Sequence, residues 1–290
     1  GVDGYISDGR AYNLNTKRWR YLPTNNELSA RVGHTALTAS NLTFEDSKGE
    51  YPIIIWGGRN RSGLLNDGAV YSKKSNNWKK ISQARNNDIV NSTTGPSART
   101  GHTAVCAEYS MLIWGGRGES GLLGDGRQYN YEKDFWIDFP TLGAPSPRIG
   151  HSAISTGTMM IVWGGELSGK KLSNDGAIFD TLNSKWIPIT SVNAPLARTG
   201  HTAIWSGAEM IIFGGHTAQG ETNTSSAYNP VTNKWRTLTL SGDPVPRTGH
   251  LAVWSGEEML IFGGLSNGKA VDKLQRLEPE TQNHYYIKID

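Results

Sequence analysis

The sequence has little that marks a disulfide-stapled, nucleic-acid-binding or membrane-spanning protein. Cys106 is the single cysteine among 290 residues, which excludes an intrachain disulfide framework. The 29 Lys and Arg residues against 26 Asp and Glu leave a net charge of +3, too small to indicate a nucleic-acid partner. No apolar run approaches the length that crosses a bilayer, so we expect no membrane span.

Helical patterns and the familiar catalytic motifs are missing as well. No apolar pattern at helical spacing is long enough to compete with short strands, so we predict an all-β fold. The sequence contains no Ser-His-Asp signature, no phosphate-binding loop and no Cys/His zinc spacing. We therefore expect neither a metal nor a cofactor.

What the sequence does contain is a repeat that starts with Arg-x-Gly-His. Its copies start at Arg31, Arg99, Arg148, Arg198 and Arg247. From the second copy onward the starts lie 148 − 99 = 49, 198 − 148 = 50 and 247 − 198 = 49 residues apart. A period of this length predicts a repeat architecture.

One copy has the pattern of four short strands, a to d. Strands a and b are residues 201–205 and 210–213, which are rich in apolar and β-branched side chains. Strands c and d are residues 225–229 and 234–238. A double glycine closes strand b in every copy. An aromatic residue in strand c is followed by Trp in strand d, 19 − 12 = 7 residues later in the first case: Tyr12/Trp19, Tyr71/Trp78, Tyr129/Trp136, Phe179/Trp186 and Tyr228/Trp235.

This unit resembles the kelch repeat, the four-stranded blade of one family of β-propellers. The resemblance covers nearly the whole chain and implies a single β-propeller domain, residues 1–290, with six blade positions. Only the outer two strands of the first blade are present, in residues 1–22, so we expect upstream residues to complete it. The full blades are expected at residues 28–82, 97–139, 146–190, 196–240 and 245–290.

Three segments depart from the repeat. Residues 41–51 lengthen the a–b hairpin of the first full blade, and residues 83–96 lengthen its connection to the next blade. Insertions confined to one blade are loops, which either serve a function or reflect neutral drift. In the last blade Leu277 and His284 replace the Tyr and Trp of the other copies, as terminal repeats commonly do.

The d–a and b–c connections of a four-stranded meander emerge on the same side, which we call the loop face. If strand a is innermost, as the resemblance implies, the five repeat arginines would ring the mouth of a central channel and form an anion site. In eukaryotic kelch domains that bind acidic peptides, an Arg at the matching position contacts ligand carboxylates. The alternative is that each Arg pairs with the Asp of a recurring Asp-Gly, present as Asp8, Asp67, Asp125 and Asp175.

The position directly after the double glycine varies in a way that the frame does not require. In chain order it is Arg59, Arg117, Glu166, His216 and Leu265. Two Arg, one Glu and one His suit a small polar ligand, whereas solvated loop residues are the alternative. The recurring histidine of each copy, at His34, His102, His151, His201 and His250, is expected to be a buried, hydrogen-bonded residue and not a metal ligand.

We predict a non-catalytic binding or assembly module whose loop face recognises a protein, or an acidic or carbohydrate partner. The alternative is a sugar-active enzyme resembling sialic-acid mutarotase, with Glu166 and His216 exchanging protons. A copper oxidase of the galactose-oxidase type needs a Cys linked to a Tyr, but Cys106 lies in a core strand. The repeat sequences resemble those of kelch arrays in bacterial secreted or periplasmic proteins, and a cytoplasmic location stays open.

Overall fold

In the computed structural model, the described residues are 8–13, 15–23, 28–39, 51–86, 88–239 and 244–277. They consist almost entirely of strands and turns, so the all-β prediction is confirmed. Across these segments η1 (Ser168–Lys170) is the one helix, a single 3-10 turn. No helix of the described segments has the length and apolarity to cross a membrane.

The strands form antiparallel sheets that follow the repeats, and we number them as blades 1 to 6. Blade 1 holds β1 (Arg10–Asn13) and β2 (Arg18–Tyr21), and blade 2 holds β3 (Thr35–Thr38), β4 (Ile53–Trp56), β7 (Gly68–Ser72) and β8 (Asn77–Lys80). Blade 3 holds β10 (Thr103–Ala107), β11 (Ser110–Trp114), β14 (Gly126–Asn130) and β15 (Phe135–Asp138). Blade 4 holds β16 (Ser152–Ser155), β17 (Met159–Trp163), β18 (Gly176–Asp180) and β19 (Lys185–Pro188). Blade 5 holds β20 (Thr202–Trp205), β21 (Met210–Phe213), β24 (Ser225–Asn229) and β25 (Lys234–Leu238), and blade 6 holds β26 (Leu251–Trp254), β27 (Met259–Phe262) and β30 (Leu274–Leu277).

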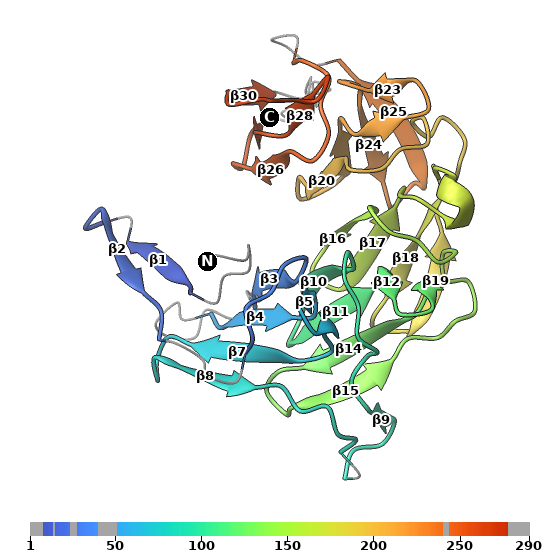
Figure 1. Cartoon of the computed structure of the whole chain (residues 1–290). Helices are drawn as coiled ribbons and strands as arrows, with labels where there is room; N and C mark the ends of the chain where they lie inside the picture. Colours follow the sequence, from blue (N-terminus) through green and yellow to red (C-terminus); the bar gives the residue numbers. More distant parts are fainter. Residues whose placement is uncertain are drawn as a thin grey trace, which may run out of the picture. The chain divides into compact units, whose positions relative to one another are not determined.

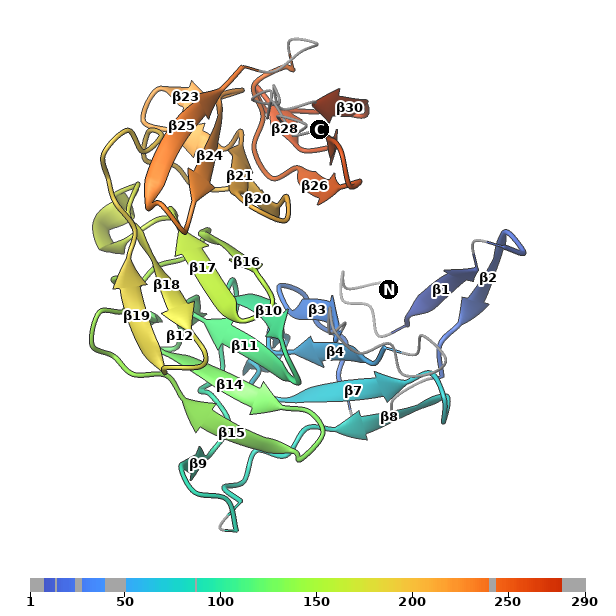
Figure 2. The same cartoon turned by 180° about the vertical axis from the view of Figure 1, so that it is seen from behind.

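The contacts divide the chain into two compact units. Unit 1 takes Gly1–Val162, Glu166–Lys171 and Gly176–Pro188, and unit 2 takes Trp163–Gly165, Leu172–Asp175 and Ile189–Asp290. Within unit 1, β3, β10 and β16 lie next to one another and β8, β15 and β19 lie on the opposite side (Figure 1). Within unit 2, β20 and β26 are likewise neighbours (Figure 2). In each unit, therefore, it is the first strands of successive blades that meet, as in a propeller. The single-domain organisation stays a prediction.

Cross-strand aromatic pairs fix the register of strands c and d. Tyr129 lies opposite Trp136, and their ring centroids are 4.8 Å apart. The equivalent pairs are present in blades 1, 2, 4 and 5. The indole Nε1 of Trp136 donates to the carbonyl of Ser82 in the preceding blade at 2.8 Å. In blades 2 to 5 the strand-d tryptophan therefore bonds to the preceding blade, and its indole provides packing between blades.

The b–c connections are more ordered than a polar loop. In four blades they form small hairpins of two paired two-residue strands. These are β5 (Arg59–Asn60) with β6 (Gly63–Leu64), β12 (Arg117–Gly118) with β13 (Gly121–Leu122), β22 (His216–Thr217) with β23 (Gly220–Glu221), and β28 (Leu265–Ser266) with β29 (Lys269–Ala270). Blade 4 has η1 in the same place. The residue after each double glycine is thus held by backbone pairing.

The segments that depart from the repeat have different outcomes. The connection at residues 83–96 forms β9 (Ser92–Thr93), which pairs with β15 and adds a fifth strand to the outer edge of blade 3. An added strand covers backbone groups that an edge strand leaves unpaired. Of the insertion at residues 41–51, only Tyr51 is described. Residues 278–290, which include His284, lie outside the described residues, and the closing of six blade positions stays a prediction.

Candidate functional site

The loop face is built by backbone bridges between the two kinds of connection. In each full blade the residue after the repeat Arg pairs with the residue after the double glycine, and the pairs are Val32 with Arg59, Thr100 with Arg117, Ile149 with Glu166, Thr199 with His216 and Thr248 with Leu265. The amides exchange hydrogen bonds in both directions, at 3.0 and 2.9 Å for Thr100 and Arg117. The d–a and b–c connections therefore emerge on the same side of each blade, as predicted.

The repeat arginines lie beneath this face. The guanidinium of Arg31 makes a bidentate pair with Asp67, at 2.8 and 3.1 Å, and Arg99 does the same with Asp125, at 3.0 and 2.9 Å. Arg99 is fully buried and also donates to the carbonyls of Gly115 and Ser97. Burial alone would raise the pKa of Asp125, but the hydrogen bonds and charge of Arg99 outweigh it and hold that pKa below its usual range.

Blades 5 and 6 replace the aspartate with neutral acceptors. Arg198 donates to the Thr224 hydroxyl at 3.0 Å and to the Gly214 carbonyl at 2.9 Å, and Arg247 donates to the side-chain oxygen of Gln275. Burial lowers the pKa of Arg198 to about 10. Arg148 is buried as well, and its Nε donates to the Ser146 carbonyl at 2.9 Å.

Each of these five arginines thus stabilises its own blade through hydrogen bonds in the blade interior. All of them are buried, and their donors point to carbonyl, carboxylate, hydroxyl or amide oxygens of the protein. The pairing with aspartate that the sequence offered as an alternative is present for Arg31 and Arg99. A ligand-binding role for the repeat arginines stays a prediction that their burial does not favour.

The recurring histidine forms the joint between neighbouring blades. Nε2 of His102 is hydrogen-bonded to the Thr35 hydroxyl of blade 2 at 3.0 Å, and its ring meets Trp56 edge-on at 5.1 Å. Its Cε1 lies 2.8 Å from the position that a Cβ on Gly57 would take, so glycine is required there. Burial, the charge of Arg99 and then that of His34 lower the pKa of His102 to about 3.

The same joint recurs along the chain. His151 bonds to Thr103 at 2.8 Å and His250 to Thr202 at 2.8 Å, and burial followed by the charge of a repeat Arg lowers the pKa of His151 to about 3 and that of His250 to about 4. His201 packs against Trp163 and Gly164. The prediction of a buried, hydrogen-bonded histidine is confirmed for His102, His151 and His250, and it is wrong for His34, which is exposed because no inner strands of a preceding blade cover it within the described residues. No group of three or more His, Cys, Asp or Glu able to hold a metal occurs in the described segments.

The varying position after the double glycine is where the loop face meets solvent. Arg59, Arg117, His216 and Leu265 are exposed, and Glu166 is half-buried. Glu166 belongs to unit 1 and His216 to unit 2. Catalysis by this pair stays a prediction.

Sequence reasoning missed further cations on the loop face of unit 1. Arg61 lies in the turn between β5 and β6, and Lys170 and Lys171 lie in and just after η1, all three exposed. Glu119, in the turn between β12 and β13, is an exposed carboxylate on the same face. The sequence held a signal for these cations, since each lies two to five residues after the varying position that follows a double glycine. Using that signal required knowing that these connections are ordered.

Comparison with protein families now adds an independent observation. The sequence matches the family model described as the KLHDC2/KLHL20/DRC7 Kelch-repeats domain over residues 3–154 and again over residues 129–290. The chain belongs to the kelch-repeat family. No curated protein matches it.

The kelch assignment explains which parts of the repeat are constant. In blades 3 to 5 the arginine, histidine, double glycine and tryptophan are joint and frame residues, because all of them are buried between strands or blades. Kelch propellers generally bind proteins, and a kelch fold by itself names no partner. Any recognition specific to this chain must come from positions that vary between its blades.

Proposed function

We propose that this kelch protein is a non-catalytic binding or assembly module that recognises an acidic protein segment with its loop face. One observation carries the proposal. In each full blade, the residue that follows the constant, buried arginine pairs with a position whose side chain is solvent-accessible. This side chain differs between blades and is Arg59, Arg117, Glu166, His216 or Leu265. A frame that needs no particular residue there leaves this position available for a ligand.

Backbone pairing supports a binding role because it fixes these side chains on ordered elements. The amide of Arg117 donates to the Thr100 carbonyl at 2.9 Å, and β12 pairs with β13 beyond it. Side chains presented from a fixed backbone lose less conformational freedom on binding than those of a loose loop. The loop face thus offers preorganised contacts.

Charge favours an acidic partner for unit 1. Its loop face carries exposed cations at Arg59, Arg61, Arg117, Lys170 and Lys171, against the carboxylates of Glu119 and Glu166. Arginine binds carboxylates in bidentate fashion, and a cationic surface also speeds encounter with an anionic segment. A glycan without acidic groups would make little use of this charge.

The proposal is tested with fluorescein-labelled deca-glutamate as the acidic probe. We expect saturable binding by fluorescence anisotropy that weakens as salt is raised, because exposed charges are screened. Arg59→Gln with Arg117→Gln should weaken binding roughly tenfold, as expected for the loss of two charged contacts of about 0.7 kcal/mol each. The melting temperature should stay unchanged.

The matched control removes two exposed cations from the outer turns of blades 2 and 3. Lys74→Gln with Lys133→Gln changes the net charge equally but leaves the loop face intact. Equal weakening by the two double variants would contradict the proposal, since binding would then follow net charge alone. The sugar-active alternative with Glu166 and His216 stays a prediction that nothing in the described residues favours over binding.

A further inference from the structure

Closed joints between blades share one set of contacts. Between blades 2 and 3, His102 bonds to Thr35 and stacks over Gly57, while the amide of Gly58 donates to the Arg99 carbonyl at 2.9 Å. Apolar residues of the two facing sheets fill the space beside these contacts, and they are Ala39, Ile54, Trp56 and Ile81 on one side and Met111, Ile113, Tyr129 and Trp136 on the other. The joint between blades 3 and 4 repeats this pattern with His151, Thr103 and Gly115.

The joint between blades 1 and 2 is closed only in its outer half. Nε1 of Trp78 donates to the Pro23 carbonyl at 3.0 Å, as Trp136 does to Ser82 one blade later. The guanidinium of Arg20 in β2 donates to the Tyr71 hydroxyl at 3.1 Å. The outer strands of blade 1 therefore already stand where a blade belongs.

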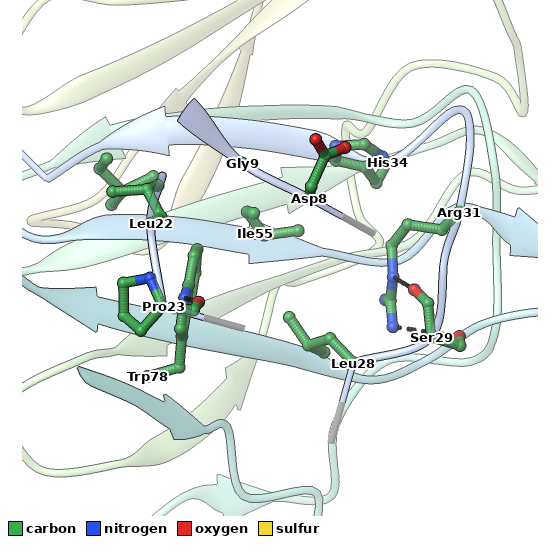
Figure 3. A pocket seen from close by; sticks show the side chains of 11 residues that line it. Asp8, Gly9, Leu22, Pro23, Leu28, Ser29, Arg31, His34, Ile55 and Trp78 are labelled. Carbon is green, nitrogen blue, oxygen red and sulfur yellow. Dashed lines mark hydrogen bonds between the residues drawn. The ribbon is translucent and has the colours of Figure 1, made fainter. Parts of the chain in front are cut away.

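Its inner half holds a cavity of about 150 Å³. Ile53 and Ile55 of β4 line it and are half-buried, whereas Met111 and Ile113 at the equivalent positions of blade 3 are fully buried. Leu22, Pro23 and Trp78 close one end, and Asp8 and His34 lie at the other (Figure 3). The apolar wall is the one that the inner strands of a preceding blade cover in the closed joints.

Two polar groups at the cavity are without the contacts that their counterparts make. His34 is exposed, while His102 at the same repeat position is buried against a threonine and a glycine. Asp8 occupies the place of Asp67 and Asp125, which pair with the buried Arg of their own blade. Within the described segments Asp8 approaches only Arg10, at 3.8 Å, and both side chains are about half exposed. The cavity thus offers an imidazole for a hydroxyl and a carboxylate for a guanidinium.

We infer that this cavity is the docking site for a two-stranded hairpin that reads Arg-x-Gly-His-Thr at its start and Trp-Gly-Gly at its end. The threonine bonds to His34, the first glycine lies against the His34 ring, and the arginine pairs with Asp8. The tryptophan and the alternate residues of the second strand cover Ile53 and Ile55. The inference concerns the chemistry that this cavity recognises, and it is independent of the loop-face proposal.

The test supplies such a hairpin to the full chain. A copy of residues 99–117, with Cys106→Ser in the copy, is fused directly before Gly1. The second glycine of the copy then precedes Asp8 by nine residues, the same step as 125 − 116 = 9 in blade 3. We expect the melting temperature to rise by at least about 5 °C. Carbethoxylation of His34 by diethyl pyrocarbonate, followed by peptide mass spectrometry, should slow roughly tenfold as the ring becomes buried.

The matched control is the same fusion with Gly115→Val in the copy, because a side chain there meets the histidine ring. We expect it to lose most of the thermal gain and to leave His34 reactive. His34→Ala in the fused chain should likewise shrink the gain relative to His34→Ala in the unfused chain. An intact fusion that changes neither melting temperature nor His34 reactivity would overturn the inference. So would a Gly115→Val fusion that performs as well as the intact one.

Discussion

At the scale of single residues, cationic and imidazole side chains divide into buried ones and exposed ones. Arg99 is fully buried and paired with Asp125, whereas Arg117, whose backbone neighbour is Thr100, extends into solvent. The division follows from geometry, since the repeat arginine faces the interior of the blade and the position after the double glycine faces solvent. Residue type alone does not reveal it.

The buried histidines make stability depend on pH. The pKa of His102 is about 3 in the folded chain against a usual value of 6.5, because burial disfavours the charged ring. The unfolded chain therefore binds this proton first, and stability falls as pH drops below 6.5. The loss should amount to about 1 kcal/mol per pH unit for each such histidine.

Denaturant unfolding between pH 7 and 4.5 measures this effect, above the range in which paired aspartates titrate. His102→Gln should reduce the slope of unfolding free energy against pH relative to the unchanged chain. An unchanged slope in that variant would mean that His102 titrates with an ordinary pKa in the folded state.

Truncating a buried residue between blades should lower the free energy of unfolding more than truncating a residue of the loop face. Trp186 is buried, and its Nε1 donates to the Pro140 carbonyl at 2.9 Å. Trp186→Ala should cost roughly 3 to 5 kcal/mol of unfolding free energy, whereas Glu166→Ala should cost under about 0.5. Comparable losses in urea denaturation would show that the division between frame and face is wrong.

At the scale of elements, the double glycine is the feature that couples a blade to the next. Gly57 has φ of 69°, and a Cβ there meets the His102 ring at 2.8 Å. Gly169 in η1 has nearly the same φ, 73°, with open space around it. Both pay the backbone strain of a left-handed conformation when replaced, so the difference between them isolates the clash at the joint.

We therefore expect Gly57→Ala to lower stability by about 1 to 3 kcal/mol more than Gly169→Ala. Thermal unfolding followed by circular dichroism measures both variants. Equal costs would mean that the joint yields to an added methyl group and that the glycine serves only its own turn.

The sequence was sufficient for the main strands but not for the small ones. Alternating apolar residues and the Tyr–Trp spacing placed β20, β21, β24 and β25 within one residue, since strand pairing fixes both register and ends. The short paired strands after the double glycines of blades 2, 3, 5 and 6 have no apolar pattern to announce them. β9 was missed for the same reason, because Ser92–Thr93 is polar and is defined only by its partner β15.

At the scale of the whole molecule, the family follows from the repeat, while the ligand does not. The Arg-x-Gly-His and Gly-Gly motifs are shared by the blades because every joint needs them, so they predicted the fold. A ligand-binding role for the repeat arginines stays a prediction. The positions of Arg61 and Lys170 depend on hairpin and turn geometry that the sequence did not disclose.

Six blade positions stay a prediction with a structural reason behind it. In blade 6, Val253 and Phe262 are 58 and 51% exposed, whereas Ile204 and Phe213 at the equivalent positions of blade 5 are buried. Apolar blade faces left in water are those that a further blade would cover. The grafted hairpin described above addresses the corresponding open joint of blade 2.

The central claim is that buried arginines hold the frame and exposed ones bind, and a comparison of Arg99→Gln with Arg117→Gln tests it most directly. Arg99→Gln should lower unfolding free energy by about 1 to 3 kcal/mol, because it leaves buried oxygens without donors. Arg117→Gln should change stability by less than about 0.5 kcal/mol and weaken deca-glutamate binding in the anisotropy assay. The opposite pattern, with Arg99→Gln abolishing binding at unchanged stability, would contradict the account.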